Sequence, residues 1–225
     1  MTAMNAFARP DAAWLLADTA QYDDAGNIIG TGSKIATSER LSTAIGISGR
    51  NAEGALVDID RWMDAQTDQP ALLASLPALV GLLVYLDQEA VANGALTDNP
   101  IPEGLRLTVA VFDQSARRGR CAIIGSTQGM ASGGEASALR PVGTLFSPPL
   151  PRDPWPGHTF DPDQTAVDLA VFQRSLADER GIFRVGGSFE AVRVHSGGIE
   201  RREIFRWDDE IGRTIGCKKR GGPNA

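Results

Sequence analysis

The chain has 225 residues, of which 42% are hydrophobic, enough to build one large domain with its own core. Its formal net charge of −6 and its pI near 5.0 argue against a general phosphate-binding surface, so no nucleic-acid partner is expected. Two cysteines are too few for a disulfide framework, and the first residues show no signal-peptide pattern. We therefore expect a cytoplasmic protein.

Short apolar runs separated by turn residues predict two strand pairs in the first fifty residues. The first pair covers residues 2–17 and turns at Arg9-Pro10-Asp11. The second pair covers residues 34–37 and 41–47, on either side of Ser38-Glu39-Arg40.

Two helices are predicted next. Residues 52–66 carry Leu56, Ile59 and Met63 on one face at helical spacing. Residues 70–92 form a more apolar helix, whose uncharged stretch 71–86 is short for a membrane span. We expect this helix to be buried on a sheet, and no membrane partner.

The second half of the chain predicts more strands around one helix. The expected elements are a strand at 105–112 with its hairpin partner at 120–125, a strand at 142–146, a proline-rich loop at 147–158, a helix at 161–180, and a closing hairpin of 189–194 and 199–207. This order indicates a layered α+β fold. One domain is expected over residues 1–216, followed by a basic, glycine-rich tail at 217–225.

Three chemically suited residues stand at even intervals near the N-terminus. Asp18 lies 16 positions after Thr2, and Lys34 lies 16 positions after Asp18. Once Met1 is removed, Thr2 carries both a nucleophilic hydroxyl and its own base, the free α-amine. A carboxylate that fixes an ammonium beside that amine would complete a catalytic site.

The segment resembles the start of a proteasome β-type subunit or of the bacterial proteasome-like peptidase, both N-terminal nucleophile (Ntn) hydrolases. In that family a mature N-terminal Thr, an Asp ending an apolar strand and a Lys before an apolar residue form the core site. Thr2, Asp18 and Lys34 match those three positions without a gap. The match covers about the first fifty residues, and the remainder agrees only in its order of elements.

The resemblance implies a four-layer αββα sandwich of two antiparallel sheets flanked by helices. It implies hydrolysis of a peptide or amide substrate through an acyl-Thr ester, without a cofactor, by a homo-oligomer whose ATPase partner, if any, the sequence does not identify. Gly49, or alternatively Gly46, would supply the backbone N–H for the oxyanion. No metal site is expected, because His158 and His195 are far apart and no cysteine pair has ligand spacing.

The chain departs from the family pattern in two places. Tyr22 stands four residues after the Asp, where proteasome-type subunits have Thr or Ser. The family's Asp-x-x-Ser-Gly-Gly motif has two possible counterparts, and both are incomplete. At Gly186-Gly187 the Asp and Ser positions hold Ile182 and Val185; at Ser196-Gly197-Gly198 the Ser is present, but the Asp position holds Arg193.

Two functional hypotheses follow. In the first, the protein is a threonine-type Ntn peptidase or amidase that is active after Met1 is removed. In the second, it is a noncatalytic Ntn-fold subunit with a structural or assembly role, in a ring or a phage-like particle such as a virion. The first requires a free Thr2 amine, whereas the second tolerates Met1 and the missing motif residues.

Overall fold

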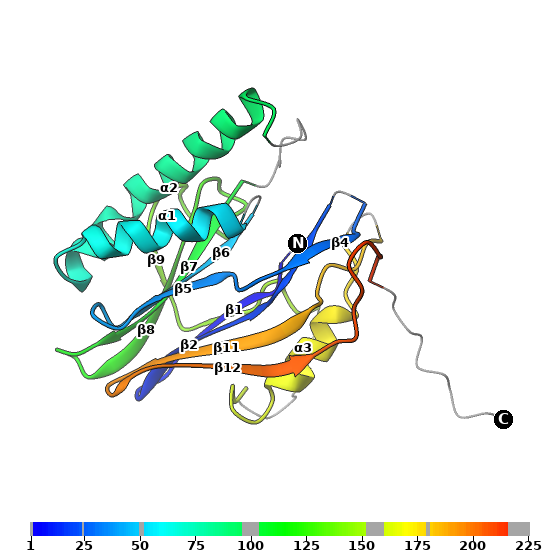
Figure 1. Ribbon diagram of the computed structural model, residues 1–225. Helices are drawn as coiled ribbons and strands as arrows, with labels where there is room; N and C mark the ends of the chain where they lie inside the picture. The colour runs from blue at the N-terminus through cyan, green and yellow to red at the C-terminus, as the bar shows by residue number, and fades with distance from the viewer. Residues whose placement is uncertain are drawn as a thin grey trace.

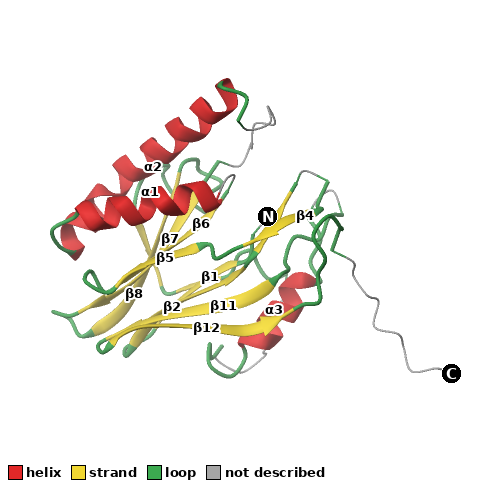
Figure 2. Cartoon of the chain, in the orientation of Figure 1, coloured by secondary structure: helices red, strands yellow, loops and turns green. Residues whose placement is uncertain are grey.

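In the described part of the chain, a computed structural model shows two five-stranded antiparallel sheets, a two-stranded hairpin and three helices (Figures 1 and 2). The structure describes residues 2–23, 25–49, 52–95, 104–151, 160–178 and 181–215, without the side chains of 52 and 53. The α+β class with antiparallel sheets, predicted from the sequence, is confirmed. The predicted C-terminal tail, residues 217–225, lies outside the described residues.

The first sheet has the strand order β10-β1-β2-β11-β12. Its strands are β1 (Met4–Ala8), β2 (Ala12–Asp18), β10 (Thr144–Leu145), β11 (Ser188–His195) and β12 (Gly198–Arg206). Every residue of β2 is buried, because β1 and β11 pair with its two edges and both of its faces are covered. The strand that carries Asp18 is therefore fixed on all sides.

The second sheet has the order β5-β6-β7-β8-β9. Its strands are β5 (Ile35–Ser38), β6 (Thr43–Ser48), β7 (Arg106–Asp113), β8 (Arg118–Gly125) and β9 (Arg140–Val142). A separate hairpin of β3 (Ala20–Tyr22) and β4 (Ile28–Thr31) follows β2 and precedes β5 in the sequence. This hairpin was not predicted.

Helices pack on the two sheets from different sides (Figure 1). α1 (Ala52–Ala65) and α2 (Gln69–Ala92) share a core with the second sheet, whereas α3 (Ala166–Arg174) shares one with the first. A third core lies between the sheets; it includes Met4, Ala6 and Leu15 from the first sheet and Ala44, Ala110 and Phe112 from the second. Side chains of even number in β1, β6 and β7 thus face the opposite sheet.

The long apolar helix α2 is only partly buried. Its residues Leu72, Leu76, Leu79, Val80 and Leu83 pack on the second sheet, as predicted. Only 28% of its most apolar stretch of 18 residues is buried, however, so the prediction of a buried helix holds for one face alone. By length and composition α2 could also cross a membrane, and the expectation that it does not stays a prediction.

Two predicted elements differ from the structure. The expected strand at 142–146 is two short strands, β9 and β10, which belong to different sheets on either side of Gly143. The expected helix at 161–180 is only α3, Ala166–Arg174. It begins late because the carbonyl of Asp161 accepts hydrogen bonds from the amides of Gln164 and Thr165, which closes a turn before the helix.

Candidate functional site

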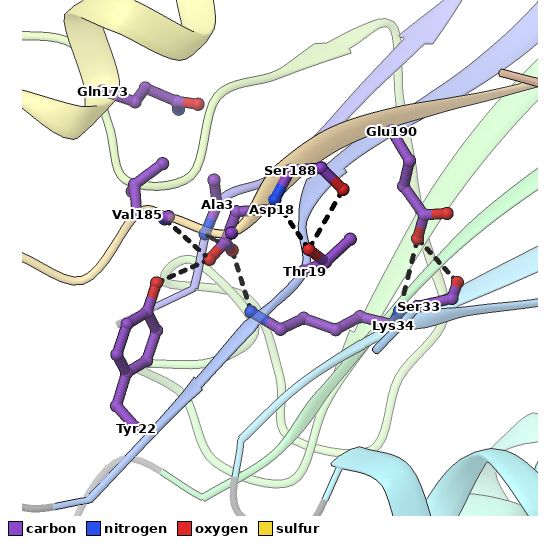
Figure 3. Close-up of polar contacts among 12 residues, drawn as sticks. Ala3, Asp18, Thr19, Tyr22, Ser33, Lys34, Gln173, Val185, Ser188 and Glu190 are labelled. Atoms are coloured by element: carbon purple, nitrogen blue, oxygen red, sulfur yellow. Dashed lines mark hydrogen bonds and ion pairs between the residues drawn. The ribbon is translucent and has the colours of Figure 1, made fainter. Parts of the chain in front are cut away.

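Asp18 and Lys34 meet at the end of β2. The Lys34 Nζ lies 2.9 Å from Asp18 Oδ1, and the two side chains are 4% and 0% exposed. Figure 3 shows the extended lysine side chain reaching across from the start of β5 to the carboxylate. The pairing expected from the even spacing is therefore present, and it joins the two sheets.

The Asp18 carboxylate accepts three further hydrogen bonds (Figure 3). The Ala3 amide donates to Oδ1 at 2.9 Å, the Tyr22 hydroxyl donates to Oδ2 at 2.8 Å, and the Gly186 amide donates to Oδ2 at 3.3 Å. A buried carboxylate is costly unless it is paired and hydrogen-bonded. Both oxygens of Asp18 meet that condition, so the site is rigid before any ligand binds.

Thr2 is held at this site through its neighbour in the chain. It is half-buried and directly precedes Ala3, whose amide donates to Asp18. Consecutive Cα atoms are about 3.8 Å apart, so the bond to Ala3 fixes Thr2 close to the carboxylate. Met1 lies outside the described residues.

Tyr22 belongs to the site, although the sequence marked it only as a departure from the family pattern. Its hydroxyl binds Asp18, and its ring centre lies 5.6 Å from the Lys34 ammonium, within cation–π range. Burial, and then the negative charge of Asp18, raise the pKa of the Tyr22 phenol well above its ordinary value. The phenol therefore stays protonated and acts as a hydrogen-bond donor.

The start of β5 is anchored from the first sheet by Glu190 of β11 (Figure 3). Glu190 Oε1 accepts from the Ser33 hydroxyl at 2.6 Å and from the Lys34 amide at 3.3 Å. Arg201 closes the contact, with its Nη1 2.8 Å from Glu190 Oε2. The backbone of Lys34 is thus fixed independently of its side chain.

Gly49 and Gly46, the two candidates for the oxyanion amide, occupy different environments. Gly46 lies inside β6, where it pairs with Ile35 on one side and Thr108 on the other. A Cβ on Gly46 would come within 2.4 Å of the Met4 Sδ, so the residue serves close packing between the sheets. Gly49 follows the end of β6 with φ +142, outside the strand ladder. This geometry favours Gly49, whose role as a donor stays a prediction.

Gly186-Gly187, not Ser196-Gly197-Gly198, lies beside Asp18. The Gly186 amide binds Asp18, whereas the second glycine pair belongs to the turn at the far end of β11, where His195 pairs with Ala12. The positions that would hold the family's auxiliary Asp and Ser are therefore Ile182 and Val185.

A hydroxyl pair that the sequence did not suggest lies next to this site. Thr19 Oγ1 accepts from the Ser188 amide at 2.8 Å and lies 3.2 Å from Ser188 Oγ. The register of β1 with β2, continued by two residues, places Thr19 opposite Thr2. The sequence held one signal for Ser188: it directly follows Gly186-Gly187, whereas the family motif has its Ser directly before the glycine pair.

No group of three His, Cys, Asp or Glu side chains that could hold a metal ion occurs in the described part of the chain. Cys121 is buried between the sheets, and burial raises the pKa of its thiol to about 12. It is therefore not a candidate nucleophile.

The fold is similar to that of a solved structure. The neighbour is Anbu from Hyphomicrobium sp. strain MC1, solved as a Gly-1 mutant. It superposes with a TM-score of 0.56 at 12% sequence identity, over 93% of this chain and 89% of that one. The chain shares the Anbu fold. No family model and no curated protein sequence matches it.

Proposed function

We propose that the protein is a threonine-type Ntn hydrolase that cleaves amide bonds with Thr2 once Met1 has been removed. The observation that carries this proposal is the buried Asp18–Lys34 ion pair, bound to the backbone directly after Thr2. The Anbu-like fold supports it. The packing of α1 and α2 on one sheet and of α3 on the other supports the αββα layer order that goes with this class.

In the proposed reaction the Thr2 amine, with a reference pKa of roughly 7.7–8.0, accepts the proton of the Thr2 hydroxyl. The oxygen attacks the substrate carbonyl while the Lys34 ammonium favours the negative charge on that oxygen. Backbone N–H groups near Gly49 stabilise the oxyanion. The leaving amine takes the proton from the Thr2 ammonium, and water then hydrolyses the acyl-Thr ester. No step requires a cofactor.

The test uses a form whose N-terminus is Thr2, verified by intact mass. We expect this form to gain the mass of one β-lactone probe. The Thr2→Ala variant should gain none, and a form that retains a residue before Thr2 should also stay unmodified. Thr2→Ser is the matched control, because it keeps a hydroxyl beside the free amine. A folded, trimmed wild-type protein that forms no adduct would contradict the proposal.

A second candidate is a noncatalytic Ntn-fold subunit with a structural role, including one in a phage-like particle. It is favoured by Ile182 and Val185, which stand where the family has its auxiliary Asp and Ser. Under either candidate we propose a cytoplasmic location and a homo-oligomer. Val57 of α1 and Tyr85 of α2, which are 50% and 56% exposed, support the homo-oligomer because a second copy could cover them. Light scattering on the size-exclusion peak tests this, and a monomer at micromolar concentration would contradict it.

A further inference from the structure

Arg106, the first residue of β7, is a buried cation without a carboxylate partner among the described residues. Its side chain binds the Ser147 hydroxyl, and its Nε has no hydrogen-bond partner. The residue is 8% exposed. Two other shielded arginines are paired, Arg174 with Asp209 at 2.5 Å and Arg184 with Asp178 at 3.0 Å.

Two hydroxyl groups beside Arg106 are also buried without a partner. Ser48 is directly opposite Arg106 in the β6–β7 ladder, and Thr108 is two residues further along β7. The Ser48 Oγ and the Thr108 Oγ1 accept and donate no hydrogen bond within the described structure. All three residues have even numbers, so their side chains face the opposite sheet. Ser48 and Arg106 are paired on neighbouring strands, which places their Cβ atoms about 5 Å apart. Unsatisfied polar groups are rare in protein interiors, so three in one patch call for an explanation.

This patch contacts the chain segment that follows Thr2. The Ser147 hydroxyl binds Arg106, and the Ser147 carbonyl accepts from the Met4 amide at 2.9 Å. Met4 also packs against Gly46, which pairs with Thr108. Thr2 lies two residues before Met4, the first residue of β1, and two residues of extended chain span about 7 Å.

We propose that Arg106, Ser48 and Thr108 form an anion site that receives a carboxylate of the substrate. An uncompensated buried charge is strongly unfavourable, and an anion that binds the guanidinium and the two hydroxyls removes that cost. A carboxylate, with a single negative charge, neutralises the one positive charge of Arg106, whereas a phosphate dianion would leave a buried excess negative charge. The substrate part of this inference rests on the proposed function; the anion site does not.

Binding of the carboxylate is tested with acetate on the full chain. Acetate should raise the melting temperature of the wild-type protein in a saturable way, at constant ionic strength. Acetamide, its neutral isostere, should not. In Arg106→Met the affinity for acetate should fall at least about tenfold, because hydrogen bonds to a charged group are lost. Chloride that binds as tightly as acetate, or acetate binding that survives in Arg106→Met, would overturn the proposal.

Arg193→Met is the matched control. Arg193 also has an Nε without a partner, but it is paired with Asp11 at 3.0 Å, and its variant should bind acetate like the wild type. Without acetate, Arg106→Met should melt no lower than the wild type, because it removes an uncompensated charge. A clear drop in its melting temperature would mean that Arg106 is structural and would overturn the proposal.

Two matched substrates then separate this inference from the proposed function. One is a fluorogenic anilide with a succinyl group, and the other has the terminal carboxylate replaced by a carboxamide. The trimmed wild type should prefer the carboxylate by at least about tenfold in kcat/KM, and Arg106→Met should lose the preference. Equal turnover of both would overturn the substrate assignment and leave the function standing. Turnover of neither, with acetate binding intact, would overturn the function and the substrate assignment but not the anion site.

Discussion

Two buried charges lie at the same end of the molecule, and their surroundings are opposite. The Asp18 carboxylate has four donors, including the Lys34 ammonium at 2.9 Å. The Arg106 guanidinium has one hydroxyl partner and an Nε without any, within the described residues. The strand register places Asp18 close to Thr2, and Ser147 links Arg106 to the amide of Met4.

The difference indicates two tasks. A charge whose partners all come from the fold is fixed in geometry before substrate arrives, as electrostatic catalysis requires. A buried charge without a counter-ion is energetically unfavourable, and a ligand that supplies the counter-ion removes that cost. We infer that the Asp18 region is built to position the nucleophile and the Arg106 region to select the ligand.

The largest effect on stability is expected for Asp18→Asn. The variant keeps the shape of the side chain but leaves the buried Lys34 ammonium without its counter-ion, which costs about 3–5 kcal/mol. Urea unfolding measures this. Adding Lys34→Met to Asp18→Asn should recover part of the loss, because no unpaired charge then remains. A single-variant cost below about 1 kcal/mol would show that the pair is not isolated from water.

A smaller loss, about 1.5–3 kcal/mol, is expected for Tyr22→Phe, which removes a hydrogen bond to a carboxylate. The variant should also change the alkaline limb of the stability profile. In the unfolded chain the phenol ionises near pH 10, whereas the raised pKa keeps it neutral in the fold. The contribution of Tyr22 is therefore complete below about pH 10 and is lost at higher pH, by up to about 1.4 kcal/mol per pH unit.

Urea unfolding of both proteins between pH 8 and 11 measures this. Other groups ionise in the same range, so the informative quantity is the difference between the wild type and Tyr22→Phe. That difference should be constant below about pH 9 and shrink above pH 10. Parallel profiles over the whole range would contradict the assignment of Tyr22 as a protonated donor.

Glu190→Gln should cost about 1 kcal/mol, because the amide keeps the size of the side chain and can still accept from Ser33. Its effect on Thr2 acylation by the β-lactone probe should be larger than its effect on stability, since Glu190 fixes the backbone of Lys34. Glu190→Asp is the comparison variant, with the charge retained but the reach shortened. If the loss of Thr2 acylation is proportional to the loss of stability in both variants, Glu190 has only a structural role.

The smallest effect is expected for Thr108→Val. The hydroxyl of Thr108 has no partner in the described structure, so its loss should change stability by less than about 0.5 kcal/mol or increase it. Thr19→Val is the matched control and should cost about 1–3 kcal/mol, because it leaves the buried Ser188 amide unsatisfied. Equal losses in urea unfolding would contradict the contrast between the two regions.

The sequence by itself determined the local elements and the pair at the centre of the site. Apolar runs and turn residues located β1, β2, β5 and β6 within a few residues, since period and turn chemistry are local properties. The interval between Asp18 and Lys34 predicted an ion pair that the structure contains. Both residues stand at the ends of strand segments, where chain connectivity limits the possible partners.

Only the tertiary structure decided the contacts between sheets. It placed Glu190 against Lys34 and Ser147 against Arg106, pairs that are 156 and 41 residues apart. It also divided the predicted strand at 142–146 between two sheets and placed the Tyr22 hydroxyl where it donates a hydrogen bond to Asp18. Such pairings depend on how two separately formed sheets stack, and no local period of the sequence records that packing.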